Sequence, residues 1–243
     1  MKMNDTNIPM SWDHPDVYRY EETISLKIPG YHHLYDITDR LMTAQLNPST
    51  SSAEVLIVGA GGGQELVTFG SRHEDWLFTG VDPSARMLEI AKLRVERAAL
   101  GPRVSFRQGT IEQLSSDHLF DAATCLLVLH FVKGLPQKLE LLHRIAEHLK
   151  PGAPIFLASI NGEPNTAAFT VQMEAWKSHM LDNGIPIQDW ERFAASLGRE
   201  SDPVRDSVVR ELLEKAGFTQ IMRYFGSYLI SAWFAVKGSR DEE

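Results

Sequence analysis

Three glycines alternate in a short segment that follows a run of apolar residues. Residues 55–58 predict a strand, and Gly59, Gly61 and Gly63 come directly after it, before a segment with helical periodicity. Because glycine has no Cβ, the backbone can turn sharply here and approach a ligand closely. The dinucleotide fingerprint needs a further glycine where Gln64 stands, so the spacing disfavours an NAD-dependent oxidoreductase. A ligand-binding loop is our interpretation, and a plain tight turn is the alternative.

An aspartate stands about 20 residues after this loop, at the end of a second predicted strand, 77–81. At this place the carboxylate of Asp82 can accept hydrogen bonds from both hydroxyls of a ribose. Ser84 follows it and is predicted to cap a helix that turns Met87 inward. The alternative is that Asp82 only favours the positive end of that helix. We interpret it as a ribose-binding acid.

The elements that position these residues alternate between strand-like and helix-like segments from residue 54 onward. Strands are predicted at 55–58, 77–81, 104–107, 122–129 and 155–159, with helices between them, which indicates a parallel sheet with crossover helices. Two further strand-like segments, 219–224 and 228–236, are joined by only three residues, too few for a parallel crossover. The predicted fold is therefore α/β: a Rossmann-like, seven-stranded, mostly parallel sheet with a C-terminal antiparallel hairpin and helices on both faces.

Two regions depart from the alternation within what we expect to be one domain, 1–243. Residues 1–50 form a leader with a helix at about 32–46, ended by Asn47 and Pro48. Residues 161–199 form an insertion of one or two helices. Both are expected over the carboxyl ends of the strands, where ligands bind in open α/β sheets. The insertion carries Trp176, His179 and Trp190, which form either an aromatic lid or ordinary packing.

The glycine loop, the acid after it and the antiparallel ending together resemble the class I SAM-dependent methyltransferases, most closely over residues 54–160. The resemblance implies S-adenosylmethionine (SAM) as cosubstrate and a small-molecule acceptor methylated at oxygen or nitrogen. Many family members carry an acid two residues before the first glycine, where this chain has Ile57, and Glu65 is the nearest substitute. The cofactor-binding residues that we predict are Tyr31, Gly59, Ala60, Gly61, Gly63, Asp82, Pro83, Met87, Thr110, Ile111 and Leu126.

Residues 27–31 and 225–229 resemble one branch of this class, the carboxy-SAM synthases. That resemblance implies that Tyr31 lies over the ligand and that Thr110 and Ile111 contact the adenine edge. An asparagine of that branch corresponds to Leu126, and its carboxylate-binding arginine aligns with Arg192 or Arg199 only after a gap. Carboxy-SAM synthesis is therefore the alternative enzyme, and a non-catalytic SAM-binding partner is the alternative outside enzymes.

The candidate catalytic residue is His130, at the end of the fourth predicted strand. Methyl transfer is a displacement that needs a general base only for a poor nucleophile, and a histidine can accept a proton near neutral pH. The alternative is a hydrogen-bonded histidine without a catalytic task. Residues Lys92, Arg94 and Arg97 are interpreted as a solvated helix face.

The composition of the chain limits which classes of binding partner and which cellular location we expect. The formal net charge of −8 argues against capture of nucleic acid, which needs a basic surface. No apolar run approaches the roughly 20 residues of a membrane span, and the first residues lack a signal peptide. Cys125 is the one cysteine, and we interpret it as a buried strand residue. Because a single cysteine cannot form an intrachain disulfide, the sequence is consistent with a reducing compartment, and we expect a cytoplasmic protein. No metal site is predicted, and the oligomeric state stays open, a homodimer included.

Overall fold

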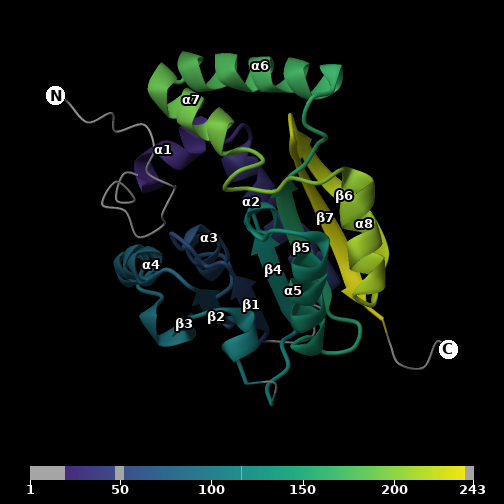
Figure 1. Cartoon of the computed structure of the whole chain (residues 1–243). Helices are drawn as coiled ribbons and strands as arrows, with labels where there is room; N and C mark the ends of the chain where they lie inside the picture. The colour runs from purple at the N-terminus through teal and green to yellow at the C-terminus, as the bar shows by residue number, and fades with distance from the viewer. Residues whose placement is uncertain (1–19, 47–51, 116, 239–243) are drawn as a thin grey trace.

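The computed structural model describes residues 20–46, 52–115 and 117–238, and Figure 1 shows the arrangement of their helices and strands. The strands are β1 (Glu54–Val58), β2 (Leu77–Asp82), β3 (Val104–Gln108), β4 (Ala122–Leu126), β5 (Pro154–Ile160), β6 (Phe218–Ser227) and β7 (Ile230–Lys237). The α-helices are α1 (Tyr20–Lys27), α2 (Tyr31–Gln45), α3 (Gln64–Gly70), α4 (Ala85–Arg97), α5 (Leu135–Glu147), α6 (Ala167–Asp182), α7 (Ile187–Ser196) and α8 (Asp206–Lys215). Short 3-10 turns, η2 (Gly101–Arg103), η3 (Ile111–Gln113) and η4 (Leu129–Phe131), complete the described part.

All seven strands form a single sheet in the order β3-β2-β1-β4-β5-β7-β6. The first five pair in parallel, and β7 pairs antiparallel with both β5 and β6. Apolar side chains of the central strands alternate between two buried layers, one under α5 and α8 and the other under α2, α3 and α4. The fold predicted from the alternation of strands and helices is confirmed.

Two boundaries differ from the prediction. β4 ends at Leu126 instead of continuing to residue 129, because Leu127 adopts a positive φ of 62°, far from the extended backbone of a regular strand. The hairpin turns at Tyr228 and Leu229, since β6 runs on through Ser227, the last of the three residues that we predicted as the link. Tyr228 also has a positive φ, of 47°, so the chain reverses there without a glycine.

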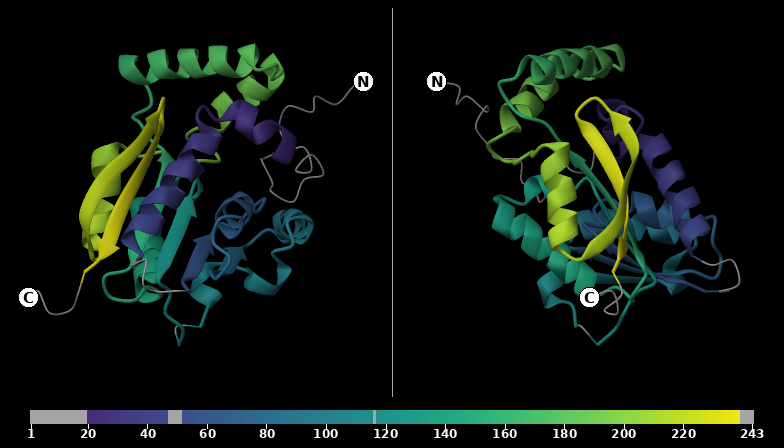
Figure 2. Two further views of the ribbon diagram at one scale, coloured as in Figure 1. Left: turned by 180° about the vertical axis from the view of Figure 1, so that it is seen from behind. Right: turned by 90° about the vertical axis from the view of Figure 1, so that its right-hand side faces the viewer.

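The leader is placed differently from the prediction. Helix α2 matches the predicted helix, but it lies along a face of the sheet beside α3, as both views of Figure 2 show, and only its start is near the strand ends. Helix α1, which we did not predict, precedes it. The Thr38 hydroxyl on α2 and the Tyr224 hydroxyl on β6 lie 2.7 Å apart, which joins the helix to the sheet. The predicted stop at Asn47 and Pro48 lies outside the described residues.

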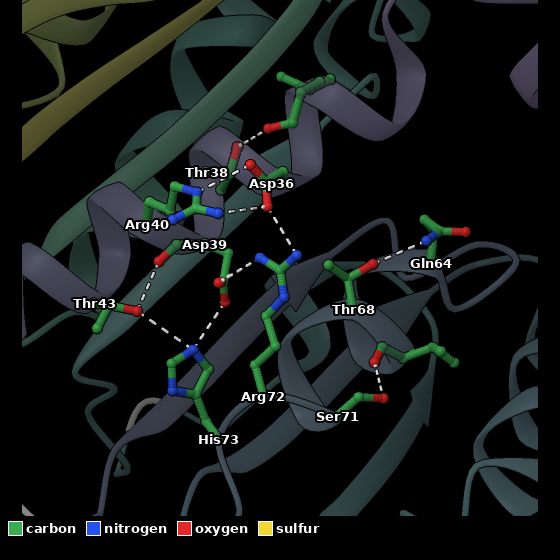
Figure 3. A network of polar contacts seen from close by, with 12 residues as sticks. Asp36, Thr38, Asp39, Arg40, Thr43, Gln64, Thr68, Ser71, Arg72 and His73 are labelled. Carbon is green, nitrogen blue, oxygen red and sulfur yellow. Dashed lines mark hydrogen bonds and ion pairs between the residues drawn. The ribbon is translucent and has the colours of Figure 1, made fainter.

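A network of charges fixes α2 to the end of α3 (Figure 3). Arg72 donates to Asp36 and to Asp39, each at 2.8 Å, and His73 Nε2 lies 2.8 Å from the second oxygen of Asp39. The side chain of Asp39 is only 6% exposed, so these two side chains, and not water, are the main partners of its carboxylate. Hydrogen bonds from Arg40 and Arg72 hold the pKa of Asp36 below its usual value.

The insertion folds as α6 and α7, which lie beyond the carboxyl ends of the strands (Figure 1). Trp176 and Trp190 are buried in a small apolar cluster with Met180 and Leu229, so they pack the insertion together. The indole N–H of Trp176 donates to the carbonyl of Lys27 at 2.7 Å, and the Lys27 ammonium lies 3.1 Å from a carboxylate oxygen of Asp189. The insertion is therefore joined to the leader.

Candidate functional site

The glycine segment forms a tight loop at the carboxyl end of β1. Gly59, Gly61 and Gly63 all have positive φ, of 75°, 44° and 76°. A Cβ on Gly59 would lie 2.2 Å from Val128 Cγ2, and one on Gly63 would lie 3.0 Å from the backbone of Ala91. These positions therefore require glycine for both conformation and space. The amides of Gly59 and Ala60 donate to the carbonyl of Val81, which ties the loop to β2.

Asp82 ends β2 directly beside this loop. One carboxylate oxygen accepts from the amide of Gly61 at 2.8 Å, and the other accepts from the amide of Ser84 at 2.9 Å. The Ser84 hydroxyl in turn caps α4 by accepting from the amide of Met87, as predicted. Each carboxylate oxygen can accept more than one hydrogen bond, so the residue can hold the loop and a ligand hydroxyl together. Asp82 therefore does more than favour a helix terminus.

The predicted solvated face of α4 is wrong for one of its residues, Arg94. Its guanidinium donates to the carbonyl of Gly62 and to the side chain of Gln64, both at 2.8 Å. This cation thus fixes the outer side of the glycine loop. Arg94 lies one helical turn after Ile90 and next to the buried Val95, and its place in a run of basic residues hid this contact from sequence analysis.

Glu65 is buried beneath the loop, in the first turn of α3, and is 4% exposed. The Thr124 hydroxyl donates to its carboxyl group at 3.2 Å. Thr124 is the register partner of Ile57, the position at which many relatives carry an acid, so α3 supplies a carboxyl group close to where β1 lacks one. Burial, together with the nearby charge of Asp82, raises the pKa of Glu65 to about 8.

The remaining predicted contacts divide into two groups. Tyr31, Ala60 and Leu126 belong to one buried apolar cluster, which joins the leader helix to α3, α4 and the central strands. Thr110 and Ile111 begin η3 after β3, and the Thr110 backbone and side chain form a capping box with Gln113. Gly109, the residue before them, donates its amide to the carbonyl of Asp82, which places this turn at the same edge. Met87 is buried and Pro83 is exposed.

His130 does not end a strand, because it lies in the 3-10 turn η4, and it is 4% exposed. Its Nδ1 accepts from the amide of Ile160 at 3.2 Å. Burial, with a smaller effect of the Lys138 cation, lowers the pKa of His130 to about 3. The ring is therefore neutral and holds η4 to β5, which is the arrangement that we gave as the alternative; a role of His130 as general base stays a prediction.

Lys138 is a residue that sequence analysis missed. Its side chain is fully buried, and its ammonium group donates to the backbone carbonyls of Leu129, Val132 and Asp202. Burial lowers the pKa of this lysine, while the carboxylate of Asp202, 3.4 Å away, opposes that change. The cation thereby holds the turn after β4 against the segment that leads into α8.

Three other residues named in the sequence analysis, Arg192, Arg199 and Cys125, lie away from the glycine loop or are buried in the sheet. Arg192 lies on α7, its side chain 64% exposed and 3.9 Å from Asp189, and Arg199 is exposed in the turn after that helix. Cys125 is buried in β4, and burial raises the pKa of its thiol, as expected for an inert strand residue. Within the described ranges no group of His, Cys, Asp and Glu is arranged to hold a metal ion. The helices of those ranges include none that is long and apolar enough to cross a membrane.

Comparison with known proteins finds similarity to methyltransferases. Residues 55–152 match the family model of a methyltransferase domain. A ubiquinone biosynthesis O-methyltransferase of Marinobacter nauticus is 29% identical over 225 residues, which cover 89% of this chain and 88% of that protein. A protein of the same name from Alkalilimnicola ehrlichii is 30% identical over 152 residues, covering 62% of this chain but little more than half, 58%, of that relative.

Among solved structures, the N-methyltransferase NodS of Bradyrhizobium japonicum, in complex with S-adenosylhomocysteine, has the same fold, with a TM-score of 0.61. The two are 14% identical, and the match covers 94% of this chain and 95% of that one. The relatives named here are methyltransferases, and none supports the carboxy-SAM branch. The loop at Gly59–Gly63, the acid at Asp82, the strand order and the family match agree: residues 55–152 are similar to the methyltransferase domain family, and the fold is that of the class I SAM-dependent methyltransferases.

Proposed function

We propose that this enzyme transfers the methyl group of SAM to an oxygen atom of a small-molecule acceptor. The observation that carries the choice of oxygen is the similarity to the Marinobacter nauticus protein, which is named an O-methyltransferase and covers nearly the whole chain. The N-methyltransferase NodS shares only the fold at 14% identity, so it carries less weight for the acceptor atom. The acceptor itself is left to experiment.

In this proposal the protein binds SAM along the carboxyl ends of β1, β2 and β4. Asp82 accepts hydrogen bonds from the ribose hydroxyls while it keeps the amide of Gly61 in place. Tyr31, from the leader, and Leu126, from β4, supply apolar contacts to SAM. Thr110 and Ile111 contact the edge of its adenine ring. Arg94 restrains the glycine loop from outside, so the loop is organised before the ligand arrives.

The partner of the SAM ammonium group is Glu65 in this proposal. A buried carboxyl group with a pKa of about 8 is mostly protonated at neutral pH, and a bound ammonium group would favour its ionised form. Binding at pH 7 should therefore release about one proton from Glu65. Calorimetric titration with S-adenosylhomocysteine in buffers of different ionisation enthalpy measures that number. Glu65→Gln should bind more weakly and release none; an unchanged proton release would assign the ammonium to another group.

The reaction on this protein requires alignment more than acid–base chemistry. The acceptor oxygen attacks the methyl carbon, the carbon–sulfur bond breaks with its electrons going to sulfur, and the hydroxyl proton leaves for solvent. His130 is neutral and bonded to the backbone of Ile160, so it is not assigned as the base. What the chain contributes is a fixed position for the methyl donor and a lid of α6 and α7 that limits water.

The test is incubation of the purified full chain with SAM and paired acceptors, each a phenol or catechol matched with the corresponding aromatic amine. Mass spectrometry should detect S-adenosylhomocysteine together with a product that has gained one methyl group on oxygen. Methylation confined to the amine of each pair would contradict the choice of oxygen. Adding prephenate in place of an acceptor tests carboxy-SAM synthesis, and a carboxy-SAM peak would favour that alternative.

A further inference from the structure

The ammonium group of Lys138, on α5, is surrounded by backbone oxygens in the interior of the protein. Its side chain is fully buried, and it donates to the carbonyls of Leu129 at 3.1 Å, Asp202 at 2.8 Å and Val132. An ammonium group has three N–H donors and no acceptor, so these three carbonyls use all of its hydrogen bonds. We call them the Lys138 cage. The cage holds together two segments that are far apart in the sequence.

One of these segments, the turn η4, lies against the glycine loop. Leu129 begins η4 and Val132 follows it, so two of the three cage carbonyls flank this turn. Val128, directly before η4, packs so closely on Gly59 that a Cβ on that glycine would lie 2.2 Å from Val128 Cγ2. The residue that ends β4, Leu126, is one of the SAM contacts proposed above. The position of η4 therefore determines where Val128 and Leu126 lie at the SAM site.

The backbone between β4 and η4 is strained, so it needs support from outside. Leu127 has a φ of 62°, in the left-handed region that residues with a side chain seldom adopt. Such a conformation persists only where the surrounding contacts hold it. One contact is the hydrogen bond from the Leu127 amide to the carbonyl of Ala158, at 2.7 Å, and the cage supplies two more directly after it, at Leu129 and Val132. Without the ammonium group we expect Leu127 to relax and η4 to shift.

The other segment is the link between the lid and α8. Asp202 lies in this link; its amide donates to the carbonyl of His130 in η4 at 2.6 Å, and its carboxylate accepts from the amide of Gly134 at 2.8 Å. A carboxylate oxygen of Asp202 also lies 3.4 Å from the Lys138 ammonium, which favours the charged form of the lysine. The cage therefore couples the position of η4 to that of the segment that follows the lid.

We propose that Lys138 is a positioning residue for SAM binding: its ammonium group fixes η4, and through Val128 and Leu126 it keeps the glycine loop in the arrangement that binds SAM. The cation does not touch the ligand in this proposal, since the cage occupies its three donors. A loop that is organised before the ligand arrives loses less conformational entropy on binding, so it binds more tightly. The inference rests on the SAM site proposed above and not on the identity of the acceptor.

The test is calorimetric titration of the full chain with S-adenosylhomocysteine at neutral pH, at a temperature where circular dichroism shows each variant folded. Lys138→Met keeps an unbranched side chain but removes the charge and all three donors. It should weaken binding about tenfold, because a loop that is no longer organised must be ordered by the ligand. Lys138→Arg retains a cation with several donors and should stay within about threefold of the wild-type affinity.

Two control variants separate positioning from general effects. Ile145→Ala removes a fully buried side chain about two turns further along α5, so it destabilises the fold without touching the cage. Lys215→Met removes an exposed lysine on α8, which is the same change of charge. Both should bind S-adenosylhomocysteine within about twofold of the wild-type protein, since neither residue contributes to the cage.

The outcomes decide between positioning and simple stability. Weaker binding in Lys138→Met, with Lys138→Arg and both controls close to wild type, supports the inference. Unchanged affinity in folded Lys138→Met overturns it, and so does equal weakening in Lys138→Arg or in Ile145→Ala. If Lys138→Met does not fold, Lys138→Gln, which retains two N–H donors, takes its place under the same criteria. Asp82→Ala, titrated alongside, separates two failures: if it weakens binding while Lys138→Met does not, the SAM site stands and only this inference is lost.

Discussion

The buried carboxyl group of Glu65 should make the free energy of unfolding fall as the pH rises. Its environment raises the pKa to about 8 in the folded protein, from 4.5 for an exposed glutamate, mainly because burial disfavours the charged form. Between these values the folded state keeps the proton while the unfolded state loses it. The folded state is then the one with more protons bound, so stability is greatest below the unfolded pKa and decreases until the folded pKa is passed.

The size of the effect follows from the same two values. Each unit of pH between these two pKa values lowers the free energy of unfolding by about 1.4 kcal/mol. Relative to low pH, where both states are protonated, the loss is below about 1 kcal/mol at pH 5, about 3 kcal/mol at pH 7 and on the order of 4 kcal/mol at pH 8. Because Glu65 is 4% exposed, solvent screening reduces this little. A penalty of that size is a large fraction of the stability of a typical domain, about 5–15 kcal/mol.

Glu65→Gln tests the reasoning, since glutamine is neutral at every pH and can still accept from Thr124. We expect the variant and the wild-type protein to unfold at similar urea concentrations at pH 5, and the variant to be more stable by about 3 kcal/mol at pH 7. Urea unfolding without SAM, followed by circular dichroism at several pH values, gives the difference. Glu89→Gln, an exposed change on α4, is the control and should show no such trend. A difference that does not grow with pH would refute the assignment of Glu65 as a buried, protonated acid.

Three further changes test the contacts described above. Asp82→Ala should weaken binding of S-adenosylhomocysteine by about 1.5–3 kcal/mol in calorimetry, and unchanged affinity in a folded variant would leave Asp82 only its loop contacts. Lys138→Met should lower the free energy of unfolding by about 2–4 kcal/mol in urea, since it removes the donor to three buried carbonyls; a loss below 1 kcal/mol would mean that water replaces it. Asp39→Ala should cost about 2–3 kcal/mol because Arg72 and His73 lose their partner, whereas exposed Asp75→Ala should cost less than about 0.5 kcal/mol; equal effects would show that the network contributes nothing.

The features that were predicted from sequence are those that local chemistry determines. The sharp turn at the GxGxG segment, the Ser84 cap and the antiparallel pairing of the last strand each depend on a few neighbouring residues, and each was confirmed. The parallel pairing of the first five strands follows from the alternation, since parallel strands need crossover connections; the order of the strands was not predicted. The glycine loop and Asp82 were inferred from residue type and spacing, and Tyr31, Thr110 and Ile111 from a family resemblance; the contacts of all of them with SAM stay predictions.

What was missed depends on contacts between segments far apart in sequence. Lys138 stands on a helix with an ordinary apolar stripe, and only the fold brings three carbonyls to its ammonium group. Arg94 stands in a basic run, and its contact with Gly62 exists only because α4 packs beside the glycine loop. Leu127 takes a positive φ that its β-rich neighbours hide, so the predicted strand ran three residues too far and misplaced His130.

The two halves of the site are held together in different ways, and this bears on the acceptor. The SAM half is fixed by short-range contacts among the glycine loop, Asp82 and Arg94. In the proposed function the acceptor side lies under the leader and the insertion, which are joined by the hydrogen bond from Trp176 to the carbonyl of Lys27 and by the ion pair between Lys27 and Asp189. Changes at the junction of Lys27, Trp176 and Asp189 should therefore alter which acceptor enters while they leave the glycine loop intact, because no residue of that loop takes part in the junction; Tyr31, also in the leader, is a proposed SAM contact and is not such a position.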